Sequence, residues 1–207
     1  KHRWRIHKTF RQRQQGVASS PSVDAPGLER LLASSCGAVP TTRNDVRVLL
    51  NGEKTFQAIE KALYNAVAYI HMEYFSIASD ELGTRIKELL VSKAKEGVKI
   101  RLLYDAVGSW QMGRAYVSDL RKAGVEIQAF MPTAFARFRS SINHRDHRKI
   151  LVVDGRTGFL VGLNIGDMYM GKNPKMGKWR DTHIMIAGAA VRELNRVFLS
   201  HWGQCTG

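Results

Sequence analysis

The sequence predicts an α/β protein in which helices pack on a mixed, largely parallel β-sheet. Short runs rich in β-branched and aromatic residues alternate with stretches of roughly 10–15 residues that carry apolar side chains at helical spacing. Two of the helical stretches end at a glycine, Gly97 and Gly124, and glycine commonly follows the last turn of a helix. With 207 residues, of which 44% are hydrophobic, the chain is long enough for one domain with a buried core.

The N-terminal part is expected to precede this domain. Residues 1–15 form a basic, juxtamembrane-like flank without an acidic residue, in which Trp4 and Phe10 stand among lysines and arginines. Residues 16–43 begin with small and polar residues and two prolines, which predicts a linker, followed by a short helix over Gly27–Ser35. The chain does not begin with Met, and we expect its natural start to lie further upstream.

The predicted domain covers 44–207, and its elements follow from periodicity. The first expected helix places Phe56, Ile59 and Leu63 on one face, and the sequence Asp154-Gly155 between two apolar runs predicts a hairpin turn. The expected strands are Val46–Leu50, Ala68–Phe75, Val98–Tyr104, Val125–Phe130, Ile150–Val153, Gly158–Val161 and Ile184–Ile186. The expected helices are Lys54–Asn65, Glu81–Glu96, 112–123 and Ala190–Trp202.

The net charge of +14 at pH 7 is unusual for a soluble domain. Such a surplus predicts attraction to an anionic partner, for which nucleic acid and an anionic membrane surface are the two candidates. The two cysteines, Cys36 and Cys205, have a spacing that fits neither a zinc site nor a disulfide framework. No apolar run reaches about 18 residues, so the sequence predicts no membrane-spanning helix.

The segment from His147 to Asn164 carries groups suited to phosphate chemistry. His147 and Lys149 are two residues apart at the start of an expected strand, so alternation directs both side chains to one face. A lysine ammonium supplies charge to phosphate oxygens, and a neutral histidine attacks phosphorus or transfers a proton. Asn164 adds a neutral donor to the same oxygens, and Gly162 lets the backbone approach closely.

Two features of this segment leave alternatives open. Asp154 completes the spacing His-x-Lys-x4-Asp and is counted with the catalytic residues, yet an aspartate before a glycine at a strand end is also typical of a turn. A zinc site formed by His144 and His147 with Asp146 or His183 is the other alternative. It has no third ligand at a recognised spacing, so we expect no metal.

The segment matches the HKD signature of the phospholipase D superfamily at His147, Lys149, Asp154, Gly162 and Asn164. The stretches Ile70–Ser109, His147–Tyr169 and Trp179–His183 resemble the first catalytic half of bacterial-type cardiolipin synthases. The resemblance covers roughly residues 44–203 and implies a phospholipase D-like α/β/α sandwich with one HKD half. Val161 departs from the pattern, because these synthases usually have a second glycine there.

The resemblance implies a phosphatidyl transfer between phosphatidylglycerol-like lipids through a phosphohistidine, without a cofactor or a metal. It makes His147 the nucleophile or its acid/base partner, with Lys149 and Asn164 on the phosphate oxygens. It also makes Asp181, in the sequence WRDTH, the acid that orients the histidine through the other ring nitrogen. Glu73 and Asp105, at the ends of two expected strands, either line the same cleft or are ordinary strand-end carboxylates.

Two HKD motifs form one active site in this superfamily, and the chain contains one. The second motif comes from a C-terminal half of a longer chain or from a second subunit, or else the chain is an inactive half. We expect a phosphatidylglycerol-like anionic lipid as partner at the cytoplasmic face of an inner membrane. The segment Phe130–Asn143 mixes phenylalanine with arginine, which suits a headgroup interface or a loop packed on the core.

Two other classes of function remain open from the sequence. The first is a phosphodiesterase: a dimeric single-HKD endonuclease acting on nucleic acid, or a phospholipase D that hydrolyses phospholipid. The charge of +14 favours the nucleic-acid form. The second is a binding module without activity, which the joint presence of His147, Lys149, Asn164 and Asp181 disfavours.

Overall fold

The computed structural model describes residues 26–36, 40–130, 145–160, 162–172 and 177–207. The chain divides into two units, Lys1–Asn44 and Asp45–Gly207. The described part of the first unit contains helix α2 (Pro26–Cys36), at the stretch where a short helix is expected. Its leucines 28, 31 and 32 are exposed.

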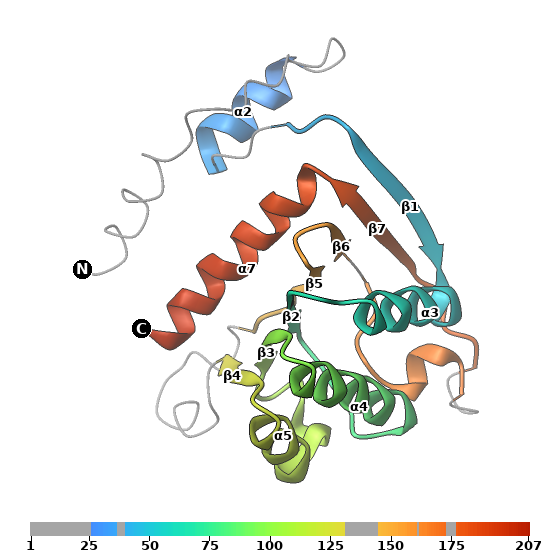
Figure 1. Cartoon of the computed structure of the whole chain (residues 1–207). Helices are drawn as coiled ribbons and strands as arrows, with labels where there is room; N and C mark the ends of the chain where they lie inside the picture. Colours follow the sequence, from blue (N-terminus) through green and yellow to red (C-terminus); the bar gives the residue numbers. More distant parts are fainter. Residues whose placement is uncertain (1–25, 37–39, 131–144, 161, 173–176) are drawn as a thin grey trace. The chain divides into compact units, whose positions relative to one another are not determined.

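The second unit is built on one sheet, whose seven strands have the order β1-β7-β6-β5-β2-β3-β4 in the described residues (Figure 1). The strands are β1 (Asn44–Leu50), β2 (Tyr69–Tyr74), β3 (Lys99–Asp105), β4 (Glu126–Phe130), β5 (Lys149–Val153), β6 (Thr157–Leu160) and β7 (Thr182–Gly188). Every expected strand has a counterpart. In the central strand β5 all residues are buried, which explains its unbroken aliphatic sequence.

The sheet is mixed as predicted, but the expectation that it is largely parallel is wrong. β2 pairs parallel with β3, and β3 with β4. β5, in contrast, pairs antiparallel with both β2 and β6, and β6 pairs antiparallel with β7. Alternation along a strand indicates which face a side chain takes and does not indicate strand direction. The predicted hairpin at Asp154-Gly155 is present and sets the antiparallel run from β5 to β6.

Helices cover both faces of the sheet, which confirms the three-layer α/β/α architecture (Figure 1). The helices are α3 (Asn51–Tyr64), α4 (Glu81–Lys95), α5 (Gly113–Lys122) and α7 (Ala190–Thr206), with short 3₁₀ turns η2 (Trp110–Met112) and η4 (Asp167–Met170). On one face α3, α4 and α5 contribute side chains such as Phe56 to the main core around Leu151. On the other face Val191 of α7 packs on Ile150 and Val152.

One edge of the sheet gathers the residues predicted for the chemistry. β2 ends there and β5 begins there, because Tyr74 pairs with Lys149. β6 ends and β7 begins at the same edge, because Leu160 pairs with both Ile150 and Ile184. The described segments that flank His147, Gly162 and Asp181 therefore converge on this edge.

Candidate active site

His147 lies at this edge, two residues before β5, and its side chain is exposed. Its imidazole stacks on the ring of Phe75, with 4.1 Å between the ring centroids and 23° between the planes. Phe75 directly follows the last residue of β2, so the pairing of β2 with β5 brings the two rings together. The stack holds the plane of an imidazole that remains open to solvent.

Lys149 is the first residue of β5 and is only 7% exposed. Its Nζ donates a hydrogen bond to the main-chain oxygen of His147 at 2.9 Å and lies 5.5 Å from the centre of the Phe75 ring. Burial lowers the pKa of Lys149, and the charges of Asp146 and Asp181 act in the opposite direction. A partly desolvated ammonium interacts strongly with an anion, because little water screens it.

Asn164 is 8% exposed and is held at both ends of its amide. Its Oδ1 accepts from the backbone N–H of Ser76 at 3.2 Å, and its Nδ2 donates to the hydroxyl of Tyr169 at 2.9 Å. The second hydrogen on Nδ2 remains for another acceptor, as a phosphate-binding role requires. Asn164 is thus pre-oriented before any ligand arrives.

Gly162 approaches the carboxylate of Asp181 so closely that a Cβ at Gly162 would lie 2.1 Å from Oδ1. The absence of a side chain at Gly162 thus makes room for the Asp181 carboxylate, and the role of Gly162 beside a phosphate stays a prediction.

Asp181 is at the start of β7, where its Oδ1 accepts from the N–H of Thr182 at 2.7 Å. Its backbone is fixed by Asn51, whose backbone N–H donates to the main-chain oxygen of Asp181 at 3.0 Å. In the described part of the chain no hydrogen bond joins Asp181 to His147.

His183 is a further residue of this edge, and the sequence had considered it only as a zinc ligand. It is 1% exposed, and neither ring nitrogen has a hydrogen-bond partner among the described residues. Burial lowers the pKa of His183 to about 4, with Asp181 opposing and Lys149 adding to the shift. His183 is therefore a neutral imidazole within the charge field of Lys149 and Asp181.

Glu73 and Asp105 do not line an open cleft, because both are fully buried. Asp105 accepts backbone hydrogen bonds from Val107 and Gly108 at 2.9 and 2.8 Å, and its other oxygen accepts from the N–H of Asp146 at 3.1 Å. Asp105 thereby fixes the residue before His147. Of the two roles that the sequence left open, these contacts fit the ordinary strand-end carboxylate, which here has a positioning role.

Glu73 belongs to a polar cluster on the face of the sheet that α7 covers. Its Oε1 lies 2.6 Å from Nδ1 of His201. Burial raises the pKa of Glu73 to about 7, the hydrogen bond from His201 opposes this shift, and Asp146 reinforces it. The Arg148 guanidinium lies 3.1 Å from Nε2 of His201 and 3.4 Å from Oδ1 of Asp146. Sequence spacing gave no signal for this cluster, because His201 is 128 residues from Glu73.

Glu73, Asp146 and His201 are the described residues whose ligand atoms lie close enough to hold a metal ion, within 4.8 Å of one another. Arg148 already supplies a positive charge to this group. Of the residues considered for a zinc site from the sequence, Asp146 faces His201 and His147 stacks on Phe75. His144 lies outside the described residues.

Asp154 is separated from His147 by the whole length of β5. Its carboxylate accepts backbone hydrogen bonds from Val67, Ala68 and Tyr69 at 3.0, 2.7 and 2.9 Å. Its φ angle is 54°, the left-handed conformation that aspartate tolerates in turns. The structure therefore gives Asp154 the turn role, in which it ties the end of β5 to the start of β2. The prediction that counted Asp154 with the catalytic residues is corrected by this position at the far end of β5.

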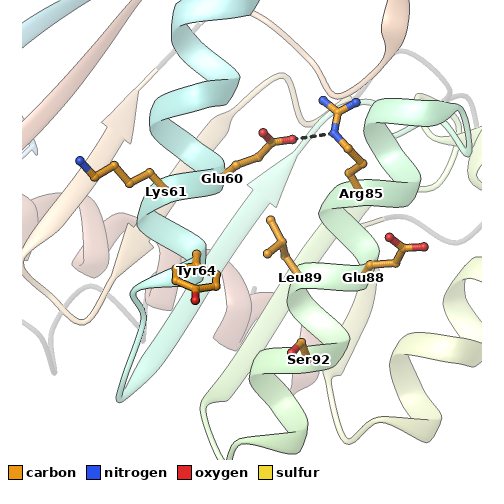
Figure 2. Close-up of a pocket in the computed structure, with 7 residues that line it drawn as sticks. All are labelled: Glu60, Lys61, Tyr64, Arg85, Glu88, Leu89 and Ser92. Carbon is orange, nitrogen blue, oxygen red and sulfur yellow. Dashed lines mark hydrogen bonds and ion pairs between the residues drawn. The ribbon is translucent and has the colours of Figure 1, made fainter.

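Two hollows stand out on the surface. A groove of about 540 Å³ between α3 and α4 is spanned by the ion pair of Arg85 with Glu60 at 3.0 Å (Figure 2). It is lined by Glu60, Lys61, Tyr64, Arg85, Glu88, Leu89 and Ser92, none of which was predicted for the chemistry. A second hollow of about 570 Å³ includes Ser76 and Tyr169, the two hydrogen-bond partners of Asn164.

The solved structures similar to this chain define its fold class. Nuc from Salmonella typhimurium, a phospholipase D family member, has a TM-score of 0.59 over 79% of this chain and 97% of its own, at 19% identity. NucT from Helicobacter pylori has a TM-score of 0.61 over 80% and 99%, at 11% identity. At such identities the likeness concerns the fold alone. The chain thus has a phospholipase D-like fold that carries one HKD motif.

Sequence comparison defines the family. Residues 57–202 match the family described as cardiolipin synthase, PLD-like domain. The chain is 50% identical over 163 residues to cardiolipin synthase of Halalkalibacterium halodurans, covering 79% of this chain and 32% of that protein. It is 48% identical over 177 residues to cardiolipin synthase 2 of Bacillus cereus, covering 85% and 34%. The chain belongs to the cardiolipin synthase family, as its motifs predicted, and spans about a third of these relatives' length.

Proposed function

We propose that the chain supplies the first HKD motif of a phosphatidyltransferase of the cardiolipin synthase type. In this proposal the enzyme moves a phosphatidyl group between phosphatidylglycerol-like lipids. The identity of 50% to a cardiolipin synthase over most of the chain carries the proposal. The convergence of His147, Lys149 and Asn164 on one sheet edge supports it.

The proposed reaction has two displacements at phosphorus. A neutral ring nitrogen of His147 attacks the phosphodiester, and the bond between phosphorus and the first glycerol oxygen breaks. The histidine of a second HKD motif protonates that oxygen as it leaves. The same histidine then takes the proton of an acceptor hydroxyl, whose oxygen attacks phosphorus and expels His147. Lys149 and Asn164 stabilise the phosphate oxygens throughout, and no step needs a metal.

Asp181 is proposed to orient a catalytic histidine and to stabilise its charged form. Its place at the start of β7, close enough for its charge to act on Lys149, supports this role. Because Asp181 bonds to Thr182 and not to His147 here, we propose that the contact forms only in the assembled site.

The second motif and the membrane are the proposed partners. We propose that the second HKD motif comes from a further half of a longer chain, as the relatives' greater length suggests, with a second copy as the alternative. We also propose binding to an anionic membrane at the cytoplasmic face of an inner membrane, supported by the net charge of +14. No helix in the described ranges is long and apolar enough to cross a bilayer. The basic flank 1–15 and most of Phe130–Asn143 lie outside those ranges.

The test is an incubation of the chain, alone and together with a second HKD half, with phosphatidylglycerol vesicles that carry labelled phosphate, stopped with alkaline detergent because a phosphohistidine hydrolyses in acid. In the presence of the second half we expect label on the protein and a product with two phosphatidyl groups, both lost in His147→Ala and retained in Glu88→Gln, a control in the distant α3–α4 groove. Chelation with EDTA should leave the turnover unchanged. A specific activity that rises with protein concentration indicates that a second copy supplies the second HKD motif. Activity that requires addition of a second HKD half indicates that the motif comes from the longer chain.

A phosphodiesterase acting on nucleic acid is the second candidate, favoured by the charge of +14. The same experiment includes an arm with single-stranded DNA. Cleavage of the DNA by the wild type but not by His147→Ala, together with no lipid product, would replace the synthase proposal.

A further inference from the structure

The hollow of about 570 Å³ is large enough for a small ligand and is not accounted for by the HKD residues. We call it the Gln111 pocket. Its lining residues are Ser76, Ala78, Asp80, Gln111, Ile165, Gly166, Asp167, Met168, Tyr169 and Lys172. They come from the segment after β2, the turn η2 and the region around η4.

The Gln111 pocket shares two of its residues with the surroundings of Asn164. Ser76 donates its backbone N–H to Oδ1 of Asn164, and the Tyr169 hydroxyl accepts from Nδ2. An isolated β-bridge joins Ile165 to Ile77, so the segment after β2 and the segment before η4 lie side by side in the pocket wall. A phosphate held at Asn164 therefore lies next to the wall of this pocket.

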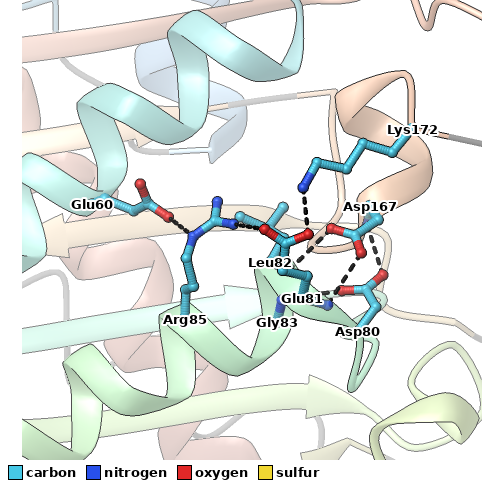
Figure 3. A network of polar contacts seen from close by, with 8 residues as sticks. All are labelled: Glu60, Asp80, Glu81, Leu82, Gly83, Arg85, Asp167 and Lys172. Atoms are coloured by element: carbon cyan, nitrogen blue, oxygen red, sulfur yellow. Dashed lines mark hydrogen bonds and ion pairs between the residues drawn. The ribbon is translucent and has the colours of Figure 1, made fainter.

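The charge of the pocket argues against a second phosphate. Asp80 and Asp167 lie at the start of α4, where they accept the backbone N–H groups that an anion would otherwise use (Figure 3). Oδ1 of Asp80 accepts from Gly83 at 3.0 Å, and Asp167 accepts from Leu82 and Glu81 at 3.0 and 3.1 Å. Two carboxylates on the wall repel an anion.

The positive charge in the pocket is also already paired. Lys172 lies 2.6 Å from Oε2 of Glu81, as Figure 3 shows. The lining contains one lysine, Lys172, and two carboxylates, Asp80 and Asp167, and the charge of the lysine is already neutralised by Glu81. The pocket thus differs in sign from the phosphate site, where Lys149 is the buried charge.

The groups that remain free in the pocket suit hydroxyls. Each carboxylate oxygen of Asp80 and Asp167 accepts one backbone N–H and keeps a lone pair for a further donor. The Gln111 side chain is exposed, and its amide has no hydrogen-bond partner in the described part of the chain. An amide donor beside carboxylate acceptors matches the alternating donors and acceptors of a polyol.

We propose that the Gln111 pocket binds the glycerol hydroxyls of the lipid headgroup whose phosphate is held at Lys149 and Asn164. This inference rests on the proposed function and names the subsite that favours a polyol over a simple alcohol or water. An uncharged polyol satisfies the free acceptors without the repulsion that an anion meets there.

The first test is binding to the whole chain, followed by NMR, with deacylated phosphatidylglycerol, glycerol alone and inorganic phosphate as separate probes. We expect the diester and glycerol to shift the side-chain amide signals of Gln111. Phosphate alone should shift the signals around His147 and leave Gln111 unchanged. Gln111→Leu should weaken diester binding about fivefold, the loss of one hydrogen bond worth about 1 kcal/mol, whereas Glu88→Gln should not.

The second test is competition between glycerol and ethanol as acceptors for the phosphatidyl group. We expect Gln111→Leu to lower the ratio of glycerol product to ethanol product about fivefold, because both products come from one intermediate. Equal diester affinity in Gln111→Leu and wild type, or an unchanged ratio, overturns the inference. This transfer reaction contains a second HKD half. If no transfer occurs there, the proposed function fails, and the binding arm still decides whether the pocket takes a polyol. Unfolding midpoints of the variants check that the exposed substitution leaves the fold intact.

Discussion

Replacing Asp154 by alanine separates a structural from a chemical role for the aspartate of the HKD motif. The change removes three hydrogen bonds to the N–H groups of Val67, Ala68 and Tyr69. Val67 and Ala68 are exposed and regain water, so each loss costs about 0.5 kcal/mol, and the half-buried N–H of Tyr69 costs about 1 kcal/mol. Alanine at a φ of 54° adds about 1 kcal/mol.

Together these losses predict a decrease of about 3 kcal/mol in the free energy of unfolding. For a domain of this size that lowers the midpoint by roughly 6–12 °C in calorimetry or thermal circular dichroism. Asp154→Asn keeps an oxygen acceptor and tolerates the left-handed conformation, so its loss should be about 1 kcal/mol.

The pH dependence of the Asp154→Ala effect is a second check. Burial tends to raise the pKa of Asp154, but the hydrogen bonds from Tyr69, Ala68 and Val67 outweigh it, so the pKa lies below its usual value. A lowered carboxyl pKa stabilises the fold above the unfolded pKa of about 3.9, and this stabilisation is lost as the pH falls through the folded value. The gap between wild type and Asp154→Ala should therefore narrow in acid. A variant with normal stability but no turnover would refute the turn role.

Three further outcomes follow from the site. His147→Ala should abolish turnover and change the unfolding free energy by less than about 1 kcal/mol, because the ring is exposed and stacks only on Phe75; unfolding several degrees lower would show that the stack is structural. The pKa of Glu73 near 7 means that the folded state binds an extra proton between about pH 4.5 and 7, so the free energy of unfolding should fall as the pH rises through this window. Urea unfolding should show this decrease in the wild type, and a flatter dependence of the unfolding free energy on pH in Glu73→Gln. His183, with a pKa of about 4, should show no titration of its ring signals by NMR between pH 5 and 8, and a midpoint near 6.5 would contradict its dry environment.

Most of the fold could be predicted from the sequence, because its local patterns of apolar residues are strong. Alternation and helical spacing predicted the strands and helices to within a few residues, and the unbroken aliphatic run of β5 is explained by burial on both faces. The error lay in strand direction, since a side-chain pattern of period two is the same whichever way the strand runs. The start of α3 was also missed, because Asn51 adopts a φ of 60° and begins the helix directly after β1.

Residues of the site that follow each other along one strand were predictable, and residues joined across the fold were not. His147 and Lys149 share a strand start, so spacing alone places them together. The ring of Phe75 beneath His147 depends on the pairing of β2 with β5, which no local pattern specifies.

Among the described histidines, none other than His147 is placed to act as the acid of the proposed transfer. His183 is neutral at physiological pH, because its pKa is about 4, so it is not in the imidazolium form that a general acid needs. His201 is bonded to Glu73 on the face that α7 covers, and His71, on the same face, is bonded to Asn195. Within the described ranges only His147 is exposed at the edge where Lys149 and Asn164 lie. If His147 becomes the phosphohistidine it cannot also be the acid, so the proton must come from a histidine outside these ranges. The proposed mechanism assigns this proton to the histidine of a second HKD motif.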